Sequence, residues 1–146
     1  MVTGNASSRS FNGPIPDTPT SFLTAADETT ESLMERARGW NCLNYNKPAE
    51  GSLTRHQMPS RDFISTCVDG LRTENAFPSC WDGVNEFDPQ DPYKHLRYAS
   101  FVLTGDCPPG FNIRLPTLLF EVIWRVADFT GIPGQFMLSM GDTTGE

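Results

Sequence analysis

Four cysteines constrain this chain more than any other feature of its sequence. They stand at positions 42, 67, 80 and 107 of 146 residues, alongside only two histidines. No pair has the C-x-x-C spacing of a structural zinc site, so disulfide bonds are the better interpretation. Four cysteines allow three pairings, which the sequence does not separate. We therefore predict a fold stapled by disulfides in an oxidising, extracellular setting, with Cys42, Cys67, Cys80 and Cys107 as the bonded residues.

The charge balance argues against two classes of partner. Lys and Arg total 11 against 18 Asp and Glu, which gives a formal net charge of −7. A surface of this sign repels a nucleic-acid backbone and an anionic membrane surface. The longest apolar stretch, LLFEVIW, contains Glu121 and is too short to span a bilayer. We therefore expect neither nucleic acid nor a membrane as a partner.

The first residues, MVTGNASSRS, lack the apolar core of a signal peptide. The chain is therefore expected to be either a cytosolic protein with reduced thiols or a piece of a longer secreted precursor. The sequon that begins at Asn5 is a glycosylation acceptor and favours the second alternative.

Residue spacing predicts one helix and a long loop in the first half of the chain. Apolar residues recur at helical spacing over 25–38, Thr24 is placed to cap the helix, and acidic residues precede basic ones as the helix dipole favours. The segment 39–60 combines two prolines with several Asn and Gly residues, which is typical of a loop.

The portion 70–140 is predicted to be rich in β-strands. Polar and apolar residues alternate there, and short apolar runs are bounded by glycine. Within the longest run, Glu121 is either solvent-facing or a buried carboxylate with a shifted pKa. The fold expected for 1–146 is a single, incomplete domain: mainly β with one α-helix, antiparallel and sandwich-like. The expected strands are 71–77, 98–104, 115–126 and 135–140.

The stretch FPSCWDG, residues 77–83, is the densest set of chemical groups in the chain. Its structural interpretation is a stapled corner, in which Cys80 forms a disulfide, Trp81 covers the bond, and the chain turns at Asp82. Its functional interpretation assigns Asp82 to a glycan subsite or to a general acid, because a rigid, aromatic-lined corner would fix that carboxylate.

Two further sets of side chains are candidates for a ligand-binding or a reactive site. In DPYKHLRY, residues 91–98, a histidine with a carboxylate would suit a divalent metal or a sugar, whereas a solvated loop is the structural alternative. A free Cys80 beside His56 or His95 would form a nucleophile, which requires an activated thiolate. We predict Asp82, Asp91 and His95 as catalytic residues, and Trp81, Asn85, Tyr93 and Tyr98 as ligand-binding residues.

Several stretches together resemble a known family. GLRTENAFPSCWDGVN, HLRY, GDCPPGFNIRLPTLLFEVIW and FMLSMGDTTG resemble the C-terminal half of DUF1996, a domain of unknown function found in fungal secreted proteins. MVTGNASSRSFNGP and NCLNYNKP resemble segments just upstream in that family. Members often carry WSC carbohydrate-binding modules, so the resemblance implies an extracellular protein that acts on cell-wall polysaccharide.

The chain also departs from the family pattern. Members usually begin upstream with a His-rich segment and continue into a His-Gly-Asp stretch, so the chain is expected to be a fragment. Pro92 stands where a histidine is common, which removes one imidazole from any site. Three functions follow as alternatives: an enzyme acting on polysaccharide, a non-catalytic glycan-binding or wall-binding module, and an inactive remnant.

Overall fold

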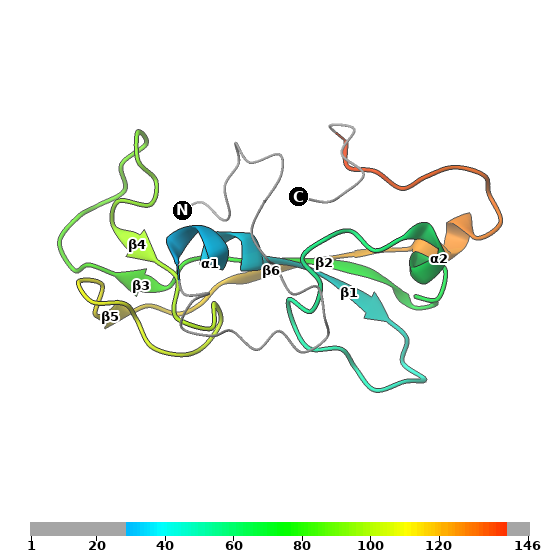
Figure 1. Ribbon diagram of the computed structural model, residues 1–146, viewed down its shortest axis with the longest axis horizontal. Helices are drawn as coiled ribbons and strands as arrows, with labels where there is room; N and C mark the ends of the chain where they lie inside the picture. The colour runs from blue at the N-terminus through cyan, green and yellow to red at the C-terminus, as the bar shows by residue number, and fades with distance from the viewer. Residues whose placement is uncertain (1–28, 140–146) are drawn as a thin grey trace. The chain divides into compact units, whose positions relative to one another are not determined.

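A computed structural model describes residues 29–139 and shows that the protein is mostly β (Figure 1). Among these residues there are two antiparallel sheets, two disulfides and one helix as long as seven residues. The predicted mainly β, antiparallel and disulfide-stapled class is thereby confirmed. Figure 1 labels the helices and strands: α1 Thr30–Arg36, β1 Arg38–Leu43, α2 Arg61–Ile64, β2 Gly70–Ala76, β3 Cys80–Trp81, β4 Leu96–Arg97, β5 Ile113–Arg114 and β6 Leu119–Trp124, followed by the 3-10 helix η2 Val126–Phe129.

The described chain divides into two compact units. The first contains residues 29–38 and 75–120, with α1 and the sheet in which β3 lies between β4 and β5. The second contains residues 39–74 and 121–139, with α2 and most of the sheet ordered β1-β2-β6. Each disulfide lies within one unit, Cys80–Cys107 in the first and Cys42–Cys67 in the second.

Strand β2 forms where the sequence predicts a strand, and it is the centre of its sheet. Against β1, the Ala76 N–H donates to the Ala37 carbonyl at 2.6 Å, and the Asp69 N–H donates to the Leu43 carbonyl at 3.1 Å. The partner residue numbers fall on one strand as they rise on the other, so the pair is antiparallel.

The register between β2 and β6 is fixed by two contacts. The Phe77 N–H donates to the Leu118 carbonyl at 2.9 Å, and the Thr73 hydroxyl donates to the Val122 carbonyl at 3.4 Å. Both contacts fit one antiparallel alignment of β2 and β6. This alignment places Glu74 opposite Glu121, with both side chains on the same face of the sheet.

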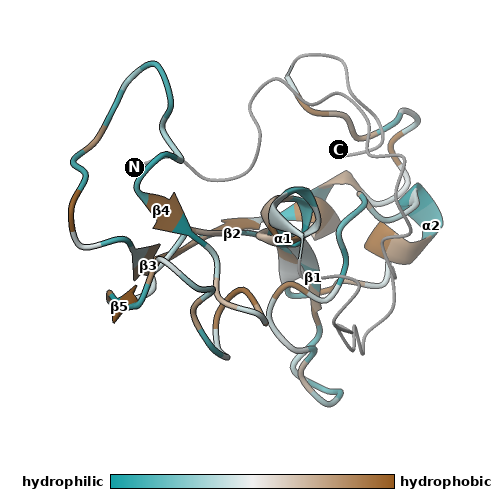
Figure 2. Ribbon diagram, turned by 60° about the vertical axis from the view of Figure 1, so that its left-hand side comes forward, coloured by the Kyte–Doolittle hydropathy of each residue, from teal (hydrophilic) through white to brown (hydrophobic). Residues whose placement is uncertain are grey.

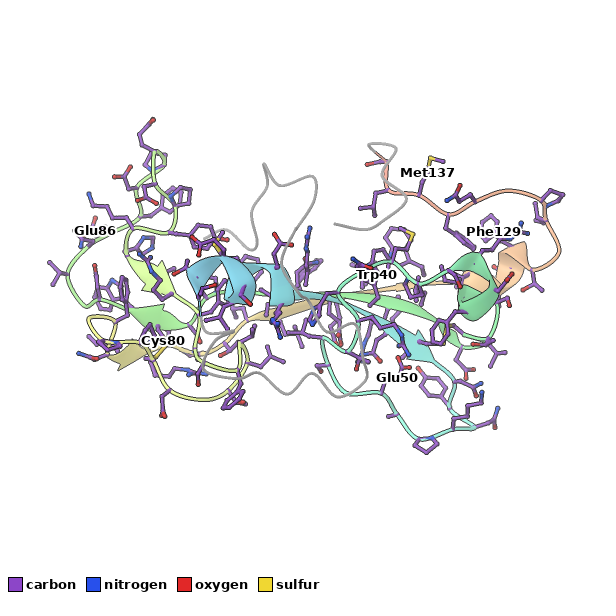
Figure 3. The ribbon with its side chains drawn as sticks, viewed as in Figure 1. Trp40, Glu50, Cys80, Glu86, Phe129 and Met137 are labelled. Atoms are coloured by element: carbon purple, nitrogen blue, oxygen red, sulfur yellow. A yellow bond between two sulfur atoms is a disulfide. The ribbon has the colours of Figure 1, made fainter. Side chains whose placement is uncertain are left out.

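The core of the second unit packs against one face of this sheet. The Cys42–Cys67 disulfide ties β1 to the turn that follows α2. Helix α2 begins at the Ser60 cap, whose hydroxyl accepts the Phe63 N–H at 3.3 Å. One cluster of buried apolar side chains forms this core, and its members are Trp40, Ile64, Cys67, Leu71 and Val126. Trp40 is labelled in Figure 3.

In the first unit, helix α1 has its own cap. The Thr29 side chain accepts the Ser32 N–H at 3.2 Å, and Arg36 in the last turn suits the helix dipole. The expected cap at Thr24 and the glycosylation acceptor Asn5 both lie outside the described residues.

Three segments differ from the sequence expectation, and one of them is the expected strand 135–140, whose described residues 135–139 form no strand. Helix α1 ends at Arg36, and β1 begins at Arg38, the last residue of the expected helix 25–38, and continues into the expected loop 39–60. This strand forms because pairing with β2 satisfies its backbone and because Trp40 and Cys42 face the core despite the loop-like composition. The segment 98–104 forms tight turns with isolated bridges in place of a strand, and Val102 there has a φ of 59°. Within the described part of the chain, its apolar run has no neighbouring strand with which to form a ladder.

No helix among residues 29–139 is long and apolar enough to cross a membrane.

Candidate functional site

The corner after β3 is built on a stapled, central strand. Cys80 is fully buried and bonded to Cys107, and it pairs with Arg97 of β4 on one side and Arg114 of β5 on the other. The sulfur–sulfur bond and two ladders therefore fix the point from which the chain turns. Figure 3 labels Cys80 in this strand and Glu86 in the loop that follows it.

Asp82 organises that turn with its carboxylate. Oδ1 accepts the N–H groups of Val84 and Asn85, each at 2.9 Å, and Oδ2 accepts the Asn85 side-chain amide at 2.5 Å. Led by the Asn85 amide, these donors hold the pKa of the Asp82 carboxyl below its usual value. The group therefore stays ionised, and a general acid would need the opposite shift.

Trp81 points to the face of β3 opposite to that of Cys80 and Asp82, and it is half-buried. Its register partners are Leu96 and Ile113, and its indole N–H donates to the Asn85 carbonyl at 2.8 Å. The side chain thus closes the turn from one side while Asp82 closes it from the other. Gly83 permits this, since its φ is 79° and a Cβ there would lie 2.7 Å from the Ile113 Cδ1 atom.

His95 lies across the strand pair from Asp82. The Asp82 N–H donates to the His95 carbonyl at 3.2 Å, and the positive form of the imidazole would favour the Asp82 carboxylate. The imidazole is 8% exposed and meets the Phe87 ring edge-on, with ring centroids 6.2 Å apart. Its Nδ1 atom has no hydrogen-bond partner among the described residues. We call the group formed by Trp81, Asp82, Asn85, Phe87 and the buried His95 the β3 corner.

The remaining predicted site residues have structural contacts. The Asp91 carboxylate is exposed and accepts the Tyr93 N–H at 3.2 Å, which begins a turn. Tyr98 is 2% exposed, and its hydroxyl donates to the Ala76 carbonyl at 3.0 Å. Burial, followed by the neighbouring Tyr98, raises the pKa of the Tyr93 hydroxyl. The two tyrosine side chains therefore lie close to each other.

Residues 29–139 form neither a metal site nor a Cys–His nucleophile. No group of three or more His, Cys, Asp or Glu side chains in this part of the chain is arranged to hold a metal ion, although Asp82, Asp91 and His95 all belong to it. All four cysteines are in disulfides, so Cys80 has no thiol to activate.

A second polar cluster lies in the second unit, and Glu121 is its only member that was singled out from the sequence; Glu121 is exposed, as its solvent-facing alternative predicts. Glu74 of β2 is 1% exposed and lies opposite Glu121 of β6, and Arg72 contacts both carboxylates. Only the register brings these side chains together, since in the sequence Glu74 reads as an ordinary polar residue of an alternating strand. Because Glu74 is buried, its carboxyl has no access to a bound polysaccharide.

Comparison with known families matches residues 1–146 to the family described as a domain of unknown function (DUF1996). No curated protein and no solved structure matches the chain.

Proposed function

The chain belongs to the DUF1996 family, and from this premise we propose that it is a secreted, non-catalytic domain that binds cell-wall polysaccharide through the β3 corner. Two disulfides support the extracellular placement, because such bonds persist in oxidising compartments. The net charge of −7 favours neutral glycans over polyanionic ones.

One observation carries the proposal: a rigid polar turn is exposed between apolar side chains. Three hydrogen bonds hold the Asp82 carboxylate, while Val84 is 81% exposed, Phe87 53% and Ile113 44%. In Figure 2 the hydrophilic colour of the loop between β3 and β4 is interrupted by a hydrophobic stretch. A sugar ring offers both apolar C–H faces and hydroxyl groups, so it matches a surface that mixes fixed polar groups with apolar ones.

Binding without hydrolysis is the form of the proposal that the corner supports. Glycoside hydrolysis needs an acid with a raised pKa beside a second carboxylate. The Asp82 carboxyl has a lowered pKa, and Asp91 is engaged in a separate turn. The exposed carboxylate is instead suited to accept hydroxyl groups, because hydrogen bonds to an ionised acceptor are stronger than neutral ones.

The test is binding of the full chain, folded under oxidising conditions, to insoluble β-glucan, chitin and cellulose. We expect retention on at least one of them, with no release of reducing sugar. Phe87→Ala should weaken binding about tenfold, the effect of removing one aromatic contact. Tyr45→Ala is the matched control, because Tyr45 is an aromatic residue with 76% exposure in the second unit.

Several outcomes would contradict the proposal or place the binding surface elsewhere. Failure to bind any of the three polysaccharides would refute it, and so would release of sugar at a catalytic rate. Unchanged binding by a correctly folded Phe87→Ala variant, or loss of binding by Tyr45→Ala alone, would move the surface away from the β3 corner. Thermal unfolding of each variant establishes that the fold is intact.

A further inference from the structure

The buried carboxyl of Glu74 has one oxygen that accepts hydrogen bonds and one that accepts none. Its Oε2 atom accepts the Leu53 N–H at 2.5 Å and lies 3.4 Å from the Asn41 amide nitrogen, which also donates to it. The Arg72 Nη2 atom lies 2.8 Å from Oε1 and forms an ion pair with it, but Oε1 accepts no hydrogen bond among the described residues. A buried carboxylate oxygen without a donor is costly to maintain.

Glu121 supplies the neighbour that this oxygen needs. It lies opposite Glu74 across the β2–β6 pair. Arg72 contacts both carboxylates, with Nη2 2.8 Å from Oε1 of Glu74 and Nη1 3.2 Å from Oε1 of Glu121. The Glu121 side chain is 40% exposed and that of Glu74 is fully buried. Two ionised carboxylates only accept hydrogen bonds and repel each other, whereas one added proton turns the contact into a hydrogen bond.

We propose that Glu74 and Glu121 hold one proton between them, and that this proton fastens strand β6 to β2. The proton is carried on Oε1 of Glu74 and donated to the Glu121 carboxylate. Arg72 balances the charge that remains on the pair. Because β6 lies at the edge of its sheet, with β2 as its partner there, a change in this contact acts directly on the attachment of the strand.

The electrostatic surroundings of Glu74 agree with this geometry. Burial raises the pKa of the Glu74 carboxyl, while the Leu53 N–H, Arg72 and the Asn41 amide act in the opposite direction and Glu121 adds to the increase. Among the described residues, the charged groups that face it are Arg72 from its own strand and Glu121 from β6; β1 and the loop at Leu53 supply neutral donors.

The sign of the pH effect follows from that direction. A carboxyl whose pKa is raised by folding binds more protons in the folded state than in the unfolded state. The attachment of β6 is therefore complete below the usual pKa of glutamate, about 4.3, and weakens as the pH rises through the raised pKa of Glu74.

The first experiment follows the carboxyl carbon of Glu74 by NMR during a pH titration of the intact chain. We expect its midpoint above the usual value, and Glu121→Gln should lower it by about one pH unit, because an amide donates to the ionised carboxylate. Glu86→Gln is the matched control, since it removes the same charge from an exposed site in the first unit and should leave the midpoint unchanged. An unchanged midpoint in Glu121→Gln would overturn the shared proton and leave burial as the sole cause.

The second experiment measures amide protection of β6 across the same pH range, corrected for the intrinsic exchange rate. Protection of residues 119–124 should fall by up to about tenfold per pH unit as Glu74 ionises. In Glu121→Gln the protection should no longer follow this titration. Protection of β6 that is independent of pH in the wild-type chain would refute the fastening role.

Discussion

Asp82 and His95 lie directly across the β3–β4 pair, where the Asp82 N–H donates to the His95 carbonyl at 3.2 Å. The preceding register pair is Trp81 with Leu96, so the Asp82 and His95 side chains share one face of the strands. Two residues of the predicted catalytic set are thus neighbours, and both flank the turn that the proposed function uses.

Gly83→Ala should weaken glycan binding and lower the free energy of unfolding by about 1–2 kcal/mol. Its φ of 79° is unfavourable for alanine, and the new Cβ would displace the flexible end of Ile113 at the β3 corner. Gly110→Ala is the matched control, because its φ is 87° and nothing lies within 4 Å of the added Cβ. Chemical denaturation and polysaccharide binding check both variants; normal binding by Gly83→Ala would show that the turn is not used.

Removing either disulfide should cost about 3–4 kcal/mol of stability, since each closes a loop of similar length. The sequence separations are 25 for Cys42–Cys67 and 27 for Cys80–Cys107. Paired Cys→Ser variants, compared by denaturant unfolding, test this equality. Under conditions where both remain folded, glycan binding should fall only in the variant without Cys80–Cys107, because that bond supports the β3 corner. Equal loss in both variants would contradict the location of the site.

Binding should weaken in acid as Asp82 becomes protonated. The pKa of its carboxyl is lowered on folding, so the turn is intact above the usual value of about 3.9 and is lost as the pH falls through the lowered pKa. Binding measured between pH 2 and 6 should show this fall, and Asp82→Asn should remove it. Asp88→Asn is the control, because the Gln90 N–H likewise lowers the pKa of Asp88, yet that carboxylate lies outside the turn.

Tyr98→Phe should destabilise the first unit without affecting glycan binding. The hydroxyl donates to the Ala76 carbonyl at 3.0 Å in the interior, so its loss should cost about 1 kcal/mol. Thermal unfolding with parallel binding measurements checks this expectation. Weaker binding at unchanged stability would instead support a direct contact between Tyr98 and the ligand.

Local features of the fold could be predicted from the sequence because they depend on residues that are neighbours along the chain. The alternation through Leu71, Thr73 and Asn75 predicts strand β2, and spacing without C-x-x-C pairs predicts that the cysteines form disulfides. The Asp82-Gly83 turn follows from turn chemistry alone, since an aspartate accepts N–H groups from the next residues.

The pairings across the structure needed the tertiary fold. Four cysteines fit three connectivities equally well, and only the closeness of β1 to the turn after α2 selects Cys42 with Cys67. Strand β1 itself is stabilised by backbone bonds to β2, which a local composition of Asn and Gly does not reveal.

The sequence by itself determined a mainly β, disulfide-stapled chain with a fixed turn at Asp82, because those properties follow from residue type and short-range spacing. Tertiary structure alone decided that His95 is buried opposite Asp82 and that Glu74 faces Glu121. The physical reason is register: side chains alternate between the faces of a strand, so the alignment of two distant segments sets which charges meet.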